Sequence, residues 1–225
     1  RRARGHAGIA RRPRLDCKQP TSGQVAILKR AALTLVMAFA ASTASADCAG
    51  SSGACEISDG EYHISLPDNA QRPTPVVVFL HGYGGSGAGT MKNTRMVGAL
   101  KARGYAVIAP YATQRPNGNR SWVFYPGWEG RDDAAFLRQV MADAGDRFGV
   151  SQQDAVLAGF SAGGFMVNYL ACASPEDFAA YAPVAGGFWR PQPENCTGPV
   201  RLFHSHGWAD KTVPLEGRYL GGKQF

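Results

Sequence analysis

Short apolar runs alternate with segments of helical spacing along most of this chain, and this alternation constrains the fold more than any other feature. The runs resemble strands that are buried on both faces, whereas the segments between them show the spacing of helices. This order predicts an α/β fold, a mostly parallel, doubly wound sheet with helices on both faces. The predicted strands are 61–66, 75–80, 105–109, 154–158, 179–184 and 200–204, and the helices 90–103, 132–148 and 162–173.

Three loops rich in glycine, proline and aromatic residues follow predicted strands. They span 81–90, 110–131 and 185–199. An open α/β sheet binds its ligand at the carboxyl ends of its strands. We therefore expect the functional site among these loops, in a single domain without internal repeats.

The segment 159–163, G-F-S-A-G, has the pattern G-x-S-x-G between a buried strand and an apolar helix. A serine hydroxyl is a weak nucleophile that needs activation. A sharp turn from strand to helix exposes its oxygen, and this turn requires small flanking residues. The context therefore predicts Ser161 as a nucleophile. The alternative is a glycine-rich turn with an idle serine.

The glycine-rich segment 81–85, H-G-Y-G-G, follows the apolar run 75–80. Backbone N–H groups of such a loop stabilise the oxyanion of acyl transfer. We assign the two donors to Tyr83 and Ala162, with Gly82 as the alternative to Tyr83, and expect His81 to brace the loop rather than act as a base. A phosphate-binding loop is the rival interpretation, but the Lys-Ser/Thr ending is absent, and we expect no cofactor.

Asp210 ends the segment 202–210, which leaves the last predicted strand. In this type of fold the catalytic residues follow the order serine, acid, histidine. Asp210 therefore fits the acid that orients a base, and Glu216 is a weaker candidate because it lies farther from the strand. A structural turn aspartate is the alternative.

The net charge of +7 has its origin in the N-terminal region. Residues 1–46 hold nine of the 24 lysines and arginines and one of the 17 acids, which leaves 15 basic and 16 acidic residues in 47–225. A nearly neutral body lacks the basic surface that nucleic acids require. We therefore expect no nucleic-acid partner.

Residues 25–46 have the pattern of a secretory signal peptide. Lys29-Arg30 precede an apolar stretch over 31–41, and Ala44-Ser45-Ala46 fit a cleavage site. The apolar stretch is too short to span a membrane. We expect an upstream or disordered arm at 1–24, a signal peptide at 25–46 and a domain at 47–225. The mature protein would then be secreted or periplasmic, without a membrane attachment.

Four cysteines remain in the expected mature part, and an even number behind an export signal favours disulfides. Three pairings are open. Cys48 and Cys55 would close a short loop, which leaves Cys172 and Cys196 as the second pair. A free buried thiol is the alternative for Cys172. No CxxC motif or nearby histidine supports a metal site, and we expect none.

Four motifs together resemble the polyhydroxybutyrate depolymerase and feruloyl esterase family of secreted α/β-hydrolases. They are F-L-H-G-Y-G-G-S-G, R-D-D-A-A-F-L, G-F-S-A-G-G and H-S-H-G-W-A-D-K-T-V-P, and the resemblance covers about residues 55–216. It implies hydrolysis of carboxylic esters, including polymeric ones, with Ser161 as nucleophile, Asp210 as acid and the loop 81–84 as oxyanion site. It also implies that Asp132 and Asp133 begin a structural helix.

The loop 121–128, S-W-V-F-Y-P-G-W, is unusually aromatic. Aromatic side chains commonly line small-molecule pockets. We predict that Trp122 and Trp128 line an acyl or aromatic pocket and that Trp189 adds to the same wall. A buried cap against the core is the alternative.

The sequence departs from this family in one respect. Family members carry a histidine well after the acid, but none of the 15 residues after Asp210 is a histidine. We therefore expect a domain that lacks its C-terminal strand and helix, and a chain with little activity. A serine peptidase of the same fold and an inactive polymer- or carbohydrate-binding module are the alternative functions.

Overall fold

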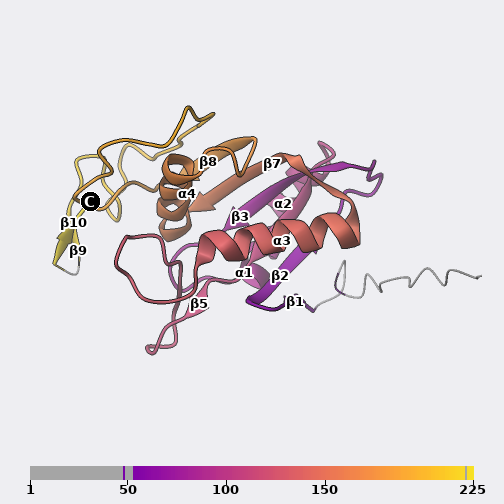
Figure 1. Cartoon of the computed structure of the whole chain (residues 1–225), viewed down its shortest axis with the longest axis horizontal. Coiled ribbons are helices and arrows are strands. Elements are labelled where there is room, and N and C mark those ends of the chain that lie inside the picture. The colour runs from indigo at the N-terminus through magenta and orange to yellow at the C-terminus, as the bar shows by residue number, and fades with distance from the viewer. Residues whose placement is uncertain (1–47, 49–52, 221) are drawn as a thin grey trace, which may run out of the picture. The chain divides into compact units, whose positions relative to one another are not determined.

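A computed structural model describes residue 48 and residues 53–220 and 222–225 (Figure 1). The predicted arm at 1–24 and the predicted signal peptide at 25–46 lie outside these residues. Within the described part, strands and helices alternate along the chain. None of the described helices is both long enough and apolar enough to cross a bilayer.

A six-stranded sheet with the strand order β1-β2-β4-β3-β7-β8 forms the centre of the domain. Its last four strands pair in parallel, whereas β1 and β2 form an antiparallel edge. The predicted mostly parallel α/β sheet is therefore confirmed. The strands are β1 (Cys55–Ile57), β2 (Gly60–Ser65), β3 (Thr74–Leu80), β4 (Ala106–Pro110), β7 (Val150–Phe160) and β8 (Ala180–Val184).

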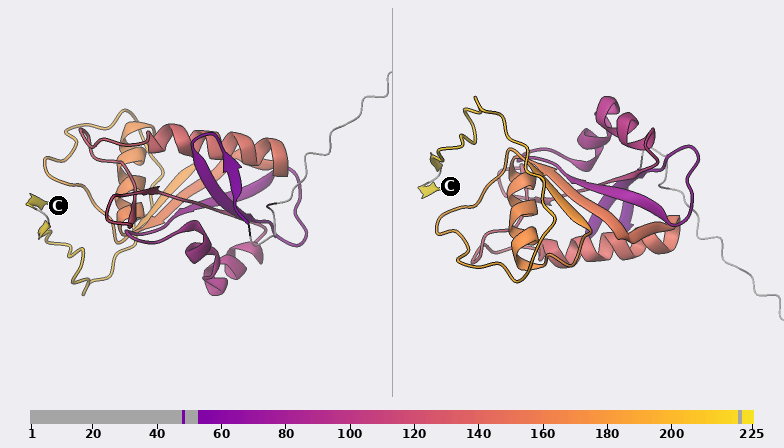
Figure 2. Two further views of the ribbon diagram at one scale, coloured as in Figure 1. Left: turned by 90° about the horizontal axis from the view of Figure 1, so that it is seen from below. Right: turned by 90° about the horizontal axis from the view of Figure 1, so that it is seen from above.

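The described helices cover both faces of the sheet. Figure 2 shows α3 on one face and α1 and α2 on the opposite face, as in a doubly wound sheet. The helices are α1 (Gly87–Met91), α2 (Thr94–Lys101), α3 (Asp133–Phe148) and α4 (Ala162–Ala173).

The prediction of one continuous helix over 90–103 is wrong, because the chain forms two helices there. Helix α1 ends at Met91, and the Asn93 side chain accepts a hydrogen bond of 3.1 Å from the Met96 N–H at the start of α2. Asparagine is a favoured N-cap residue, since its side chain satisfies a backbone donor that the helix leaves free. The capping bond of Asn93 thus starts a second helix inside the segment whose apolar spacing predicted a single helix.

The main core lies between the sheet and the helices α3 and α4. Its buried members include Leu80, Ile108, Phe136, Leu157 and Met166, all with at most 2% of their surface exposed. Burying a side chain of this size contributes about 1.5–3 kcal/mol. The carboxyl ends of β3, β7 and β8, where the loops of the predicted site begin, are therefore anchored to a buried core.

The predicted strand at 200–204 forms only two isolated parallel bridges to β8, Tyr181–Leu202 and Val184–Ser205. Its Phe203 side chain is 76% exposed. Two ribbons of two-residue strands were not predicted, because strands of this length have no recognisable periodicity. They are β5 (Thr113–Gln114) with β6 (Arg120–Ser121), and β9 (Tyr219–Leu220) with β10 (Lys223–Gln224).

The structure contains both disulfides of one of the three open pairings. Cys48 is bonded to Cys55, and Cys172 is bonded to Cys196. The second disulfide joins the last turn of α4 to the loop after β8. The free buried thiol considered for Cys172 is therefore excluded.

Candidate active site

Ser161 occupies the turn between β7 and α4 in a conformation that is rare for any residue except glycine. Its backbone angles are φ 53° and ψ −118°, and its N–H donates a hydrogen bond of 3.0 Å to the carbonyl oxygen of Val184. Strained backbone of this kind persists only where the surrounding structure imposes it. The predicted sharp turn from strand to helix is thus present at the predicted position.

Three glycines permit this turn because no side chain would fit at their positions. A Cβ atom on Gly159 would lie 2.6 Å from the carbonyl oxygen of Gly163, and one on Gly164 would lie 2.6 Å from the carbonyl oxygen of Val184. A Cβ atom on Gly163 would overlap the carbonyl group of Leu80. The glycines therefore let α4 approach β7, β8 and β3 closely enough to lift Ser161 out of the sheet.

The loop after β3 lies directly beside Ser161. A Cβ atom on Gly82 would be 3.4 Å from the Cβ atom of Ser161. Within the described part of the chain, the Tyr83 N–H has no acceptor, although the neighbouring Gly84 and Gly85 N–H groups bond Arg120 and Gly82 carbonyls at 2.8 and 3.0 Å. Free donors next to a nucleophile are what an oxyanion site requires.

Ala162 is the first residue of α4 and follows Ser161 directly. The N–H groups in the first turn of a helix have no partner inside the helix. The positive end of the helix dipole also favours negative charge at this point. The predicted second oxyanion donor is thus placed at the start of a helix, next to the predicted nucleophile.

The carboxylate of Asp210 is held by backbone donors of its own loop. Its Oδ1 atom accepts hydrogen bonds from the N–H groups of Val213 at 2.9 Å and Thr212 at 2.8 Å. These bonds hold the pKa of the Asp210 carboxyl below its usual range. The Oδ2 atom lies 3.7 Å from Nε2 of His206. The geometry accommodates both a catalytic acid and the alternative, a structural turn aspartate.

The described histidines are bonded away from Ser161. The Nε2 atom of His206 lies 2.6 Å from the carbonyl oxygen of Val213, and its Nδ1 atom lies 3.3 Å from Nε2 of His204. His63 bonds the hydroxyl of Tyr111 at 2.9 Å. His81 bonds backbone groups of Gly82 and Ala112. No base for Ser161 is therefore paired with it among the described residues.

Trp122 does not line an open pocket as predicted. Its side chain has no exposed surface, and its indole N–H donates a hydrogen bond of 2.8 Å to the carbonyl oxygen of His81. The indole also packs on the His81 ring, with 5.1 Å between the ring centroids. Trp122 therefore corresponds to the alternative interpretation, a buried cap, and supports the loop after β3.

Trp128 and Trp189 form one aromatic wall, and its role in lining an acyl or aromatic pocket stays a prediction. Both are partly buried, and their ring centroids lie 6.5 Å apart. Phe124, Phe165 and Tyr169 join them through ring contacts of 5.0 to 5.9 Å. Phe165 and Tyr169 were not predicted as members of this wall, although their spacing of four residues places both on one side of α4.

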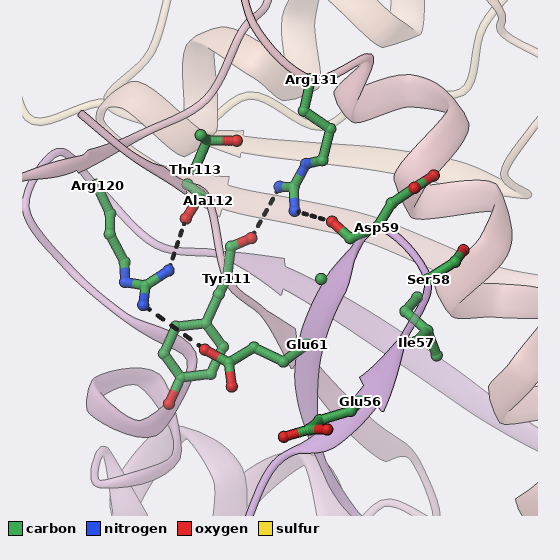
Figure 3. Close-up of a pocket in the computed structure, with 11 residues that line it drawn as sticks. Glu56, Ile57, Ser58, Asp59, Glu61, Tyr111, Ala112, Thr113, Arg120 and Arg131 are labelled. Atoms are coloured by element: carbon green, nitrogen blue, oxygen red, sulfur yellow. Dashed lines mark hydrogen bonds and ion pairs between the residues drawn. The ribbon is translucent and has the colours of Figure 1, made fainter. Parts of the chain in front are cut away.

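A cavity of about 660 Å³ lies between the β1–β2 hairpin and the loop after β4 (Figure 3), and Ser161 is not among the residues that line it. Arg131 donates to the carbonyl oxygens of Asp59 and Tyr111 at 2.9 and 2.8 Å. It also forms an ion pair of 2.6 Å with the buried Asp133. The bonds of Arg131 to Asp59 and Tyr111 were not predicted, since no local pattern indicates partners 72 and 20 residues away in the sequence.

The helix start predicted at Asp132 and Asp133 is confirmed. The Asp132 side chain caps α3 by accepting a hydrogen bond of 2.9 Å from the Ala135 N–H. The Asp133 carboxylate accepts one of 2.6 Å from the Val123 N–H and pairs with Arg131. Both residues thus fix the aromatic loop and α3 in place. Within the described ranges, no three potential ligand side chains gather to hold a metal ion.

Comparison with known proteins supports an esterase family. A probable feruloyl esterase C of Aspergillus oryzae is 28% identical over 184 residues, which cover 77% of this chain and 63% of that protein. A poly(3-hydroxyalkanoate) depolymerase C of Paucimonas lemoignei is 29% identical over 133 residues, which cover 54% of this chain and 30% of that protein. The chain therefore spans less than two thirds of the length of these relatives.

The fold is also similar to that of esterases whose structures have been solved. The acetyl xylan esterase from Aspergillus awamori matches with a TM-score of 0.58 at 16% sequence identity, covering 73% of this chain and 74% of that one. A family model described as Phospholipase/Carboxylesterase matches residues 63–223. The resemblance derived from the motifs is confirmed, and this chain belongs to the phospholipase/carboxylesterase family of α/β-hydrolases.

Proposed function

We propose that this chain is a serine esterase that cleaves carboxylic esters through an acyl-enzyme on Ser161. The observation that carries the proposal is the strained turn at Ser161 with the loop 82–83 directly beside it. Such a turn costs about 1–3 kcal/mol of backbone strain. A fold that retains this cost at a serine next to free backbone donors is suited to nucleophilic acyl transfer.

In the proposed reaction, the Ser161 oxygen attacks the ester carbonyl carbon. The negative charge that develops on the carbonyl oxygen is stabilised by the N–H groups of Tyr83 and Ala162. Each such donor contributes about 3 kcal/mol to the transition state. The alcohol then leaves, and water hydrolyses the acyl group from Ser161. Asp210 takes the role of the acid that orients a histidine base.

The base is the part of this mechanism that the described residues do not supply. His63, His81 and His206 each have a firm partner elsewhere, and His204 lies against His206. Loss of one catalytic partner of the serine lowers turnover by several orders of magnitude. We therefore propose that the chain of 225 residues acylates slowly and deacylates more slowly still.

The substrate class follows from the relatives' names and from the aromatic wall. One relative is named for a feruloyl ester and another for a polyhydroxyalkanoate. Trp128 and Trp189 offer a broad apolar surface to an acyl group. We propose feruloyl or short hydroxyalkanoyl esters, including polymeric ones. The two disulfides support a secreted or periplasmic protein, since such bonds persist in oxidising compartments.

One rival function is a catalytically inactive module that binds a polymer or carbohydrate. It is favoured by the histidines that are bonded away from Ser161. This rival predicts that the chain binds an insoluble polymer equally well with Ser161 or with alanine at that position. It also predicts that no ester is turned over above the background rate.

A comparison of wild type with Ser161→Ala tests the esterase proposal. p-Nitrophenyl, feruloyl and hydroxybutyrate esters are the substrates, and a peptide panel reports on peptidase activity. We expect weak ester hydrolysis that Ser161→Ala abolishes, with unchanged circular dichroism. Hydrolysis that persists in the alanine variant would remove Ser161 from the mechanism.

A further inference from the structure

We propose that His81 is a positioning residue that aims the Tyr83 N–H at the oxyanion. This inference rests on the proposed function of Ser161 and deepens it. His81 itself contacts no reacting atom in the proposal. It acts on the peptide unit between Gly82 and Tyr83 through the hydrogen bonds of its ring.

The two ring nitrogens of His81 bond two different backbone groups. The Nδ1 atom lies 2.7 Å from the carbonyl oxygen of Gly82, and the Nε2 atom lies 3.2 Å from the backbone nitrogen of Ala112. A carbonyl oxygen only accepts, and an amide N–H only donates. The proton must therefore sit on Nδ1, while Nε2 must carry the lone pair.

Burial keeps the ring in this neutral form. The His81 side chain is only 5% exposed. Burial lowers the pKa of its imidazole, the positive charge of Arg120 lowers it further, and the bond to Gly82 opposes both. A protonated ring would also present a second N–H to the Ala112 N–H, which cannot accept it. One tautomer is thus fixed by the surroundings of the ring.

The fixed tautomer determines the direction of a backbone donor. In a planar trans peptide, the C=O and N–H groups point in opposite directions. The Gly82 oxygen is held by Nδ1 of His81 and by the Gly85 N–H at 3.0 Å. The Tyr83 N–H therefore points away from the imidazole. Gly82 itself lies against Ser161, so this donor belongs to a peptide beside the nucleophile.

A second set of contacts keeps the imidazole in place. Trp122 packs on the ring and bonds the His81 carbonyl oxygen at 2.8 Å. The Arg120 guanidinium donates to the Ala112 carbonyl oxygen at 3.0 Å (Figure 3). The carbonyl oxygen of Arg120 accepts a hydrogen bond of 2.8 Å from the Gly84 N–H. The imidazole thus connects the oxyanion loop to the loop after β4, and small movements of His81 would reach the Tyr83 peptide.

Two amide substitutions separate the two bonds of the ring. The side-chain nitrogen of His81→Asn can replace Nδ1 and donate to Gly82, whereas the longer side chain of His81→Gln reaches the position of Nε2 instead. His81→Ala removes both bonds. His63→Gln is the matched control, since His63 is also a buried histidine that bonds a single partner, Tyr111.

The rate constant for labelling of Ser161 by a fluorophosphonate reports on the oxyanion donors, because the phosphoryl oxygen takes the place of the carbonyl oxygen. We expect His81→Asn to stay within about threefold of wild type. His81→Gln and His81→Ala should be slower by about 10- to 100-fold, which is less than the roughly 100- to 1,000-fold effect of losing one donor outright, because the Tyr83 N–H is misaligned rather than removed. His63→Gln should label like wild type. Thermal unfolding of every variant shows whether it is folded.

The tautomer is tested independently of reactivity by ¹⁵N NMR of the imidazole in the wild-type chain. We expect a protonated Nδ1 and an unprotonated Nε2 at neutral pH. A proton on Nε2, or equal labelling rates for folded His81→Asn and His81→Gln, would overturn the proposal. A folded wild type that is never labelled at Ser161 would contradict the proposed function instead, while the NMR result would still decide the orientation of the ring.

Discussion

Ser161 illustrates how single residues determine this site. Its positive φ of 53° is unfavourable for a serine, yet Val184 binds its N–H, and the glycines around it let the backbones of α4, β3 and β8 pack closely. Packing of the surrounding backbone therefore maintains this strained conformation. The Ser161 side chain does not contribute to it, since it makes no capping hydrogen bond to α4. Its oxygen stays available for chemistry.

Gly163→Ala should destabilise the protein, because its methyl group would overlap the backbone of Leu80. Overpacking against rigid backbone costs about 3 kcal/mol. Gly98→Ala is the matched control, since a Cβ atom there meets nothing within 4 Å and the residue lies inside α2. This control should raise the free energy of unfolding by about 0.5–1 kcal/mol. Urea unfolding measures both changes, and equal effects would contradict the packing argument.

The hydrogen bonds from the Thr212 and Val213 N–H groups to the Asp210 carboxylate should weaken in acid. The lowered pKa of its carboxyl means that the folded state disfavours the proton, so the stabilisation is present above the unfolded pKa of about 3.9 and is lost as the pH falls through the lower folded value. Amide exchange of Thr212 and Val213 should therefore accelerate in that acidic range. In Asp210→Asn, which keeps an acceptor oxygen, exchange should follow the intrinsic pH dependence alone. Identical profiles would exclude the carboxylate as the cause.

At the scale of elements, α4 connects the site to the rest of the fold. Its first residue follows Ser161, and its last turn carries Cys172, which is bonded to Cys196. The loop from 185 to 196 begins where Ser161 is bonded, at the end of β8, and returns to α4 through this disulfide. It also carries Trp189, so the disulfide secures the aromatic wall.

Removal of each disulfide should lower stability according to the loop that it closes. The sequence separations are 24 residues for Cys172–Cys196 and seven for Cys48–Cys55. The chain-entropy model gives losses of about 3.5 and about 2.5 kcal/mol, respectively. Guanidinium unfolding of the two double alanine variants measures this difference. A larger loss from the short loop would show that contacts, rather than chain entropy, dominate.

The elements nearest the site could be predicted from the sequence, because their signals are local. The apolar run before Ser161 and the small residues after it identified β7, the turn and α4 together. The break between α1 and α2 could not be predicted, since it depends on the capping bond of Asn93 rather than on apolar spacing. The segment 200–204 has the composition of a strand, yet only two bridges connect it to β8.

At the scale of the whole molecule, the contacts that could not be predicted join segments far apart in the chain. Trp122 was expected in a pocket, but its burial depends on the loop after β3, 41 residues earlier. The ion pair of Arg131 with Asp133 is local, whereas its bond to Asp59 spans 72 residues. Periodicity and motifs carry no information on such pairs. They identified Ser161 and the glycine-rich loop, but not the network that orients them.

The hydrogen-bond partners of the described histidines predict slow ester turnover by this chain. Since each described histidine is bonded away from Ser161, we expect ester hydrolysis at least about 1,000-fold below the typical enzymatic rate of about 10 s⁻¹. Added imidazole should accelerate it by acting as an external base. Turnover at ordinary rates that is lost on Ser161→Ala would mean that one of these histidines moves to serve as the base.

Slow deacylation permits the most direct test of the central claim, that Ser161 is the nucleophile. The chain is mixed with p-nitrophenyl acetate, quenched in acid and digested, and the peptides are mapped by mass spectrometry. We predict one acetyl group on the peptide that contains Ser161, formed together with a burst of p-nitrophenolate, and neither signal in Ser161→Ala. A folded wild type without acetyl on Ser161, or a burst that the alanine variant retains, would contradict the account.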